Sequence, residues 1–153
     1  TLGEVIVIHR GKPVVLMTAH MLPSWKNTTD IRLREIAAIE RASRRHLRQN
    51  RSVIVMGDAN HSPDTPEYLA WGKAGFVDAY LASGGDPEAG LTCPSSSLTE
   101  RIDYIWVVGQ LSNQIVESHP LTDSEFHIDG DHSSESALSD HVPVICILRT
   151  VSR

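Results

Sequence analysis

Two short apolar runs on either side of one long amphipathic segment constrain the fold of this chain most strongly. Residues 14–19 and 53–56 are continuously apolar rather than alternating, which is typical of strands buried on both faces. Between them, residues 31–49 have helical spacing and follow two candidate N-caps, Thr29 and Asp30. A buried strand, a helix and a second buried strand in this order predict the α/β fold class.

Three further segments extend this pattern. Residues 4–10 are rich in β-branched side chains and precede a Gly-Lys-Pro turn, so they predict a strand that forms a hairpin with the first apolar run. Residues 102–108 and 142–148 predict two later strands, and Pro143 places the last one at a sheet edge or at a strand start. The chain shows no internal repeat, and its 153 residues favour one domain.

Charge is unevenly distributed along the chain. The net charge is −5, but residues 26–51 carry eight Lys and Arg against three Asp and Glu. We interpret the arginines of the predicted helix as its solvent-facing side, because an acidic chain is not typical of a nucleic-acid clamp. The two cysteines predict no disulfide framework. We recognise no signal peptide and no transmembrane segment, so a cytoplasmic location is the default expectation.

Polar residues stand at four places where predicted strands begin or end. Ligands bind beyond the carboxyl ends of strands in open α/β sheets, so these residues are the candidates for chemistry. They are His20 after the first apolar run, Asp58 and Asn60 after the second, Asp103 at the start of the next strand, and Asp140 and His141 before the last.

Each of these signals has a structural alternative. Asp58 and Asn60 are two residues apart, so in an extended chain both face one target, such as a water, a phosphate oxygen or a metal. An Asx turn is the equally weighted alternative. Asp103 shares its strand face with apolar residues, so its carboxylate needs a partner. A histidine is one candidate partner, and Arg101 is the other.

Taken in order, four motifs resemble the endonuclease/exonuclease/phosphatase superfamily. They are Thr-x-His, Gly-Asp-x-Asn, Arg-Ile-Asp-Tyr-Ile and Ser-Asp-His-x-Pro, and they span nearly the whole chain. The resemblance implies a four-layer α/β/β/α sandwich with mixed β-sheets, like the deoxyribonucleases. It also implies that residues 1–153 are the C-terminal portion of a single domain, because the Asn and the principal metal-binding Glu of that family have no counterpart here. We therefore expect the missing N-terminal half, or a second chain, as a partner.

The resemblance implies a metal-dependent phosphoesterase that uses Mg²⁺ or Mn²⁺ and in-line attack by water. By resemblance, His20 contacts the phosphate, Asp58 and Asn60 position the water, Asp103 orients a histidine, Asp140 binds the metal, and His141 is the base or stabilises the phosphate. The substrate is left open among nucleic acid, phosphoinositide and phospholipid headgroup. The alternative is a catalytically inactive, truncated domain that binds phosphate groups or a protein partner.

Overall fold

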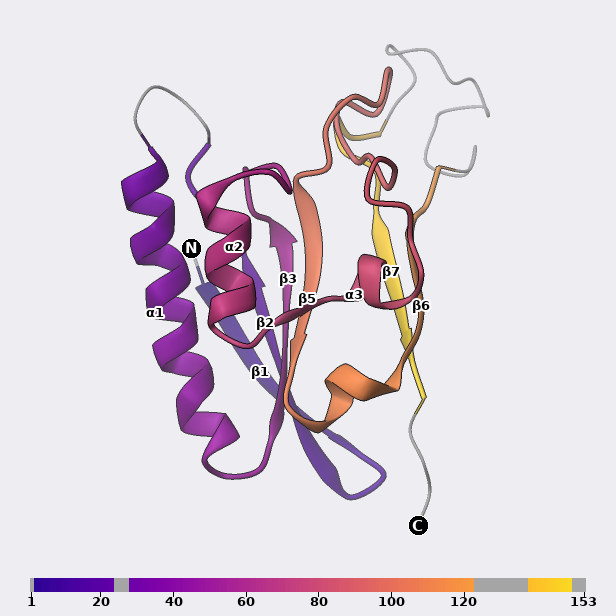
Figure 1. Ribbon diagram of the computed structural model, residues 1–153. Coiled ribbons are helices and arrows are strands. Elements are labelled where there is room, and N and C mark those ends of the chain that lie inside the picture. Colours follow the sequence, from indigo (N-terminus) through magenta and orange to yellow (C-terminus); the bar gives the residue numbers. More distant parts are fainter. Residues whose placement is uncertain (1, 24–27, 123–137, 150–153) are drawn as a thin grey trace.

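A mixed five-stranded sheet forms the centre of the computed structural model, which describes residues 2–23, 28–122 and 138–149. Its strand order is β1-β2-β3-β5-β4, and Figure 1 shows the sheet beside its helices. Neighbouring strands pair antiparallel except for the parallel pair β2 and β3. The strands are β1 (Leu2–His9), β2 (Lys12–Ala19), β3 (Ser52–Asp58), β4 (Val77–Asp78) and β5 (Asp103–Val108). The predicted hairpin and both buried runs are therefore confirmed.

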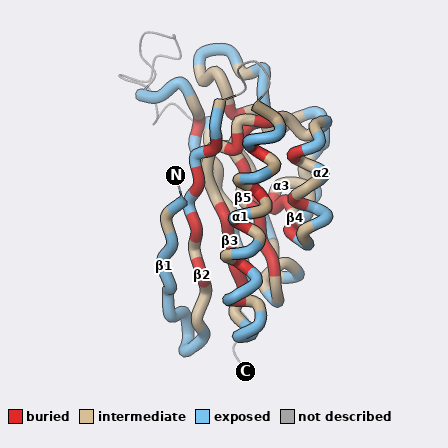
Figure 2. The backbone as a smooth tube through the Cα atoms, turned by 90° about the vertical axis from the view of Figure 1, so that its left-hand side faces the viewer, coloured by how far each residue is buried: buried red, intermediate tan, exposed pale blue. Residues whose placement is uncertain are grey.

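Two helices, α1 (Thr29–Leu47) and α2 (Pro66–Lys73), cover one face of this sheet. Ile36 and Ile39 of α1 and Trp71 of α2 pack with Val15 and Val53 in one buried cluster. Figure 2 shows the buried residues concentrated in β2, β3 and β5, whereas β1 is mostly exposed. A short helix, α3 (Ala79–Ala82), follows β4 directly. None of the described helices is both long and apolar enough to cross a membrane.

A second, two-stranded sheet packs on part of the other face. It consists of β6 (Ile115–Pro120) and β7 (Val144–Leu148), and the 3-10 helix η1 (Gln110–Gln114) leads into it. Cys146 and Leu148 of β7 pack on Ile54 and Val107 of the large sheet. Pro143 directly precedes β7, as expected for a proline at a strand start.

The prediction that the arginines of α1 all face solvent is wrong for Arg32. Its side chain is 6% exposed, and its Nε and NH2 atoms donate to Glu67 Oε1 of α2 at 2.9 and 2.6 Å. A buried charge needs such a partner, and α2 supplies it at a position that the sequence of α1 does not reveal. The helix also begins at Thr29, two residues before the expected range of 31–49, with Thr28 as its N-cap.

Candidate active site

The end of β3 and the start of β5 bring two carboxylates together. Asp58 and Asp103 are register partners on these antiparallel strands. The preceding Gly57 has a φ of +138°, and a Cβ there would lie 2.2 Å from the carbonyl oxygen of Ala19. Only glycine allows this approach of β3 to the end of β2, and it brings the residue after β2, His20, to the same edge of the sheet.

Asp58 and Asn60 form a closed turn rather than two parallel side chains. The backbone N–H of Asn60 donates to Asp58 Oδ1 at 2.8 Å, and Asn60 Nδ2 donates to Asp58 Oδ2 at 3.0 Å. Asn60 Nδ2 also donates to the carbonyl of Met21 at 3.0 Å. The predicted Asx turn is thus present, and Asp58 and Asn60 also lie at the same edge of the sheet as Asp103. Burial raises the pKa of Asp58, the Asn60 N–H partly offsets this, and the charge of Asp103 raises it further.

The partner of Asp103 is a histidine, not Arg101. His141 Nδ1 lies 2.7 Å from Asp103 Oδ2, and both side chains are mostly buried. Burial alone would lower the pKa of His141, but the hydrogen bond and charge of Asp103 outweigh it and raise that pKa above its usual value. Thr92 supports the pair, because its Oγ1 accepts from the backbone N–H of Asp103 at 3.3 Å and its carbonyl accepts from the N–H of Val142.

Five of the six candidate residues meet at this edge. His20 Nε2 lies 3.5 Å from Asp58 Oδ2, although its side chain is 68% exposed. Among the described residues, one group could hold a metal ion: Asp58, Asp103 and His141, whose ligand atoms all lie within 4.8 Å of one another. Asp140 is exposed and is not part of this group; its carbonyl accepts from Ser95 N at 2.7 Å. A hollow of about 370 Å³ opens beside His141, large enough for a small ligand.

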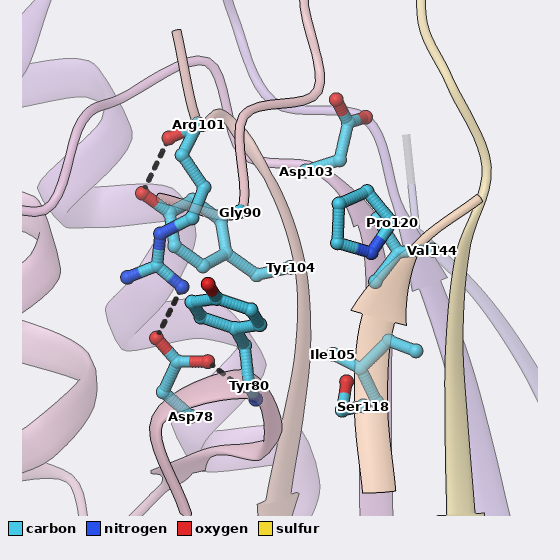
Figure 3. Close-up of a pocket in the computed structure, with 10 residues that line it drawn as sticks. All are labelled: Asp78, Tyr80, Gly90, Arg101, Asp103, Tyr104, Ile105, Ser118, Pro120 and Val144. Atoms are coloured by element: carbon cyan, nitrogen blue, oxygen red, sulfur yellow. Dashed lines mark hydrogen bonds and ion pairs between the residues drawn. The ribbon is translucent and has the colours of Figure 1, made fainter. Parts of the chain in front are cut away.

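Arg101 instead anchors the chain just before β5. Its NH1 atom donates to Asp78 Oδ2 at 2.8 Å, and Figure 3 shows its guanidinium beside the rings of Tyr80 and Tyr104. The two ring centroids lie 5.1 and 5.0 Å from Cζ. A Cβ on Gly90 would lie 2.7 Å from the Tyr80 ring, so glycine is needed for this packing. The buried cluster fixes the main chain directly before Asp103.

Thr92 and His61 support the site residues but were not predicted from the sequence. Thr92 is 1% exposed, and it lies outside the four motifs. His61 directly follows Asn60 and is 3% exposed. No pattern marked it, because the partner that explains its burial, Trp71, lies on the next helix.

The family model of the Endonuclease/Exonuclease/phosphatase family matches residues 8–141, a span that contains every candidate residue. The chain belongs to this family. The resemblance seen in the four motifs is therefore confirmed. A search of curated proteins gives no match.

Solved structures of the endonuclease/exonuclease/phosphatase fold match most of this chain. A mannosyl-6-phosphatase from Bacteroides thetaiotaomicron superposes with a TM-score of 0.73 at 22% identity, over 92% of this chain and 53% of its own. Humanized D. rerio TDP2 gives 0.72 at 18% identity, over 97% and 60%. A family protein from Leptotrichia buccalis gives 0.67 at 20%, over 97% and 53%. At these identities the likeness shows the fold, and the chain spans little more than half of each match.

Proposed function

We propose that this chain is the C-terminal part of a metal-dependent phosphoesterase that hydrolyses phosphodiesters or phosphomonoesters by in-line attack of water. The observation that carries the proposal is the 2.7 Å contact between His141 Nδ1 and Asp103 Oδ2, next to the carboxylate of Asp58. A histidine oriented by one carboxylate beside a second carboxylate suits proton transfer and charge stabilisation at a phosphate. Membership of the family supports this reaction class.

Asp58 and His141 divide the proton chemistry in this proposal. A carboxylate with a raised pKa is the stronger base, whereas a histidine with a raised pKa more readily stays protonated at neutral pH. Asp58, with Asn60, thus orients the attacking water and accepts its proton. His141, held by Asp103 through Nδ1, donates from Nε2 to a phosphoryl oxygen, and His20 contacts the same phosphate.

The donor set fits a divalent cation. Asp58 and Asp103 offer carboxylate oxygens that lie within 4.8 Å of each other, and Mg²⁺ or Mn²⁺ takes carboxylate oxygens and keeps several waters. Asp140 and a carboxylate from the rest of the domain complete the ligands in our proposal. When bound, the cation acts as a Lewis acid on the phosphoryl oxygen.

The rest of the domain covers the open face of β1 and β2 in this proposal. Val5 and Val7 are 57% and 41% exposed, and they share a face with their register partners Leu16 and Val14, opposite α1. An apolar sheet face of this kind is a packing surface for a second sheet. The matched structures contain additional chain to form one, since this chain covers only 51–61% of each. The result would be the four-layer α/β/β/α sandwich with mixed sheets.

The substrate class stays open within phosphate esters. One matched structure is named as a mannosyl-6-phosphatase, and another is a D. rerio TDP2 complexed with single strand DNA product. Substrates this different on one fold are expected where peripheral loops set specificity. The alternative is a truncated domain that binds phosphate groups or a protein partner without turnover. This chain lacks counterparts of the Asn and the metal-binding Glu that the family resemblance implies, and their absence would favour this alternative.

Hydrolysis of bis-p-nitrophenyl phosphate and of p-nitrophenyl phosphate tests the proposal. The chain is assayed alone and together with the N-terminal portion of its gene product, each with Mg²⁺, Mn²⁺ or EDTA. We expect metal-dependent turnover in the completed domain and its loss in His141→Ala and Asp58→Ala. Gln110→Ala, far from the site at the start of η1, is the control and should keep the parent rate.

The preference between the two esters would narrow the substrate class. Metal-independent turnover, or turnover that survives both alanine variants within a few-fold, would contradict the site assignment. Phosphate binding without any turnover in the completed domain would favour the inactive alternative.

A further inference from the structure

The histidine that follows the Asp58–Asn60 turn is held in one protonation form by its neighbours. Trp71 Nε1 lies 3.1 Å from His61 Nε2, and an indole N–H is a donor only. His61 Nε2 must therefore be the acceptor, which places the proton of the neutral ring on Nδ1. The carbonyl of Ser62 lies 3.3 Å from Nδ1 and accepts that proton's hydrogen bond.

The same residue also contacts the strand that carries Asp103. The His61 ring stacks on Tyr104, with centroids 5.1 Å apart and planes at 23°. The Tyr104 hydroxyl lies 3.0 Å from the carbonyl oxygen of His61 and 2.7 Å from that of Arg101. His61 thus joins the turn that holds Asp58 to the start of β5.

The turn needs such an anchor. Asn60 has a φ of +51°, in the left-handed region that is sparsely populated by residues other than glycine. Asn60 makes its two hydrogen bonds to Asp58 in that conformation. A strained conformation persists where the surrounding structure fixes it, and the buried residue immediately after Asn60 is in the position to do so.

We propose that His61 is a positioning residue, which fixes the Asp58–Asn60 turn against the start of β5 through the Nδ1–H tautomer imposed by Trp71. The inference rests on the proposed function in that Asp58 and Asn60 are the groups being positioned. Burial lowers the pKa of His61 to about 4, which agrees with a neutral ring at physiological pH.

Two tryptophans give a matched pair of variants. Trp71 and Trp106 are 1% and 3% exposed, and their rings stack at 5.3 Å with planes at 13°. Trp71 donates to His61, whereas Trp106 Nε1 is buried without a hydrogen-bond partner among the described residues. Trp71→Phe and Trp106→Phe therefore remove the same volume from one cluster, but only the first releases the tautomer of His61.

The measurement is NMR of the metal-free chain: ¹⁵N shifts of the His61 ring and amide exchange at Asn60. In Trp71→Phe we expect mixed ring tautomers and Asn60 exchange faster by about 2- to 10-fold, the effect of losing one hydrogen bond. In Trp106→Phe both readouts should stay at the parent values. Neither depends on hydrolysis, so a chain without phosphoesterase activity still tests the inference.

A second pair of variants covers the case in which Trp71→Phe does not fold. Gln at position 61 can accept the Trp71 N–H through Oε1, whereas Leu cannot, so His61→Gln should keep the Asn60 protection that His61→Leu loses. Equal acceleration in the two tryptophan variants, or equal loss in the Gln and Leu variants, would reduce His61 to a packing residue and overturn the inference. Unchanged Asn60 exchange in Trp71→Phe would also overturn it.

Discussion

Asp58 and Asp103 lie opposite one another on antiparallel β3 and β5, so two carboxylates share one end of the sheet. His141 is hydrogen-bonded to Asp103, and Asn60 is hydrogen-bonded to Asp58. Each carboxylate therefore has its own hydrogen-bond donor, while the two repel each other. This arrangement determines how the site titrates.

Asp103→Asn should lower two pKa values at once. The pKa of His141 falls because burial is then no longer outweighed by the charge of Asp103, and that of Asp58 falls because a like charge is lost. Because the pKa of His141 is raised in the fold, the stabilisation it gives is present below about pH 6.5 and is lost as pH rises through the folded value. NMR titration in EDTA measures both groups.

The exposed Asp140 offers the control for this titration. It also raises the pKa of His141, but as the smallest of the named contributions. Asp140→Asn should therefore lower the pKa of His141 less than Asp103→Asn does. Equal decreases in the pKa of His141 would mean that it depends on the net charge of the site and not on the hydrogen bond to Asp103.

Gly57→Ala should be among the most damaging single substitutions. Its Cβ would meet the backbone oxygen of Ala19 at 2.2 Å, with φ at +138°, so we expect a loss of about 2–4 kcal/mol in unfolding free energy. Gly72 is the control, since it lies inside α2 with nothing near its missing Cβ. Gly72→Ala should stabilise the chain by about 0.5–1 kcal/mol. Urea denaturation checks both, and similar losses in the two variants would contradict the steric argument.

Stability should fall on acidification because of His61. Burial lowers its pKa to about 4; Ser62 and Glu67 act in the opposite direction, and Arg32 and Arg101 add to the lowering. Between pH 6.5 and 4 the unfolded chain binds a proton at this histidine that the folded chain does not. The free energy of unfolding therefore decreases as the pH is lowered from 6.5 to 4, by roughly 3 kcal/mol over the whole window.

Urea denaturation at several pH values measures this loss in the parent and in His61→Gln. In His61→Gln, the free energy of unfolding should differ much less between pH 7 and pH 4.5 than it does in the parent. A comparison with the parent is needed because other groups titrate in the same range, His141 with the opposite sign. Identical pH profiles would contradict the assignment to His61.

Arg32→Met should destabilise the chain by about 3–5 kcal/mol, because it leaves Glu67 buried without its ion partner. Its double variant with Glu67→Leu should recover much of the loss. Arg44→Met is the matched control on the same helix, since Arg44 is 60% exposed in its pair with Glu40 and such pairs contribute about 0–1 kcal/mol. Urea denaturation distinguishes the three, and a double variant as unstable as Arg32→Met would contradict the buried-charge explanation.

Local pattern was sufficient for the long strands of the large sheet, for α1 and for the convergence of the motifs, but not for the short elements β4, α3 and η1 or for the choice of partners. Continuous apolar runs identified β2 and β3 because burial on both faces leaves no room for polar residues. The need of Asp103 for a partner was also evident from its strand face. Which group supplies it was not, because His141 lies 38 residues further along the chain. Arg32 and His61 were missed for the same reason, since both are explained by residues of α2.

His141 lies three residues before β7, whereas Asp103 begins β5, so their hydrogen bond exists only while the small sheet stays packed on the large one. The interface that holds the sheets together is apolar and lies away from the pair, around Ile54, Val107, Cys146 and Leu148. In the proposed phosphoesterase, a compound that bound between the two sheets would separate His141 from Asp103 without occupying the proposed phosphate position. Inhibition of that kind would be non-competitive, and substrate could not relieve it.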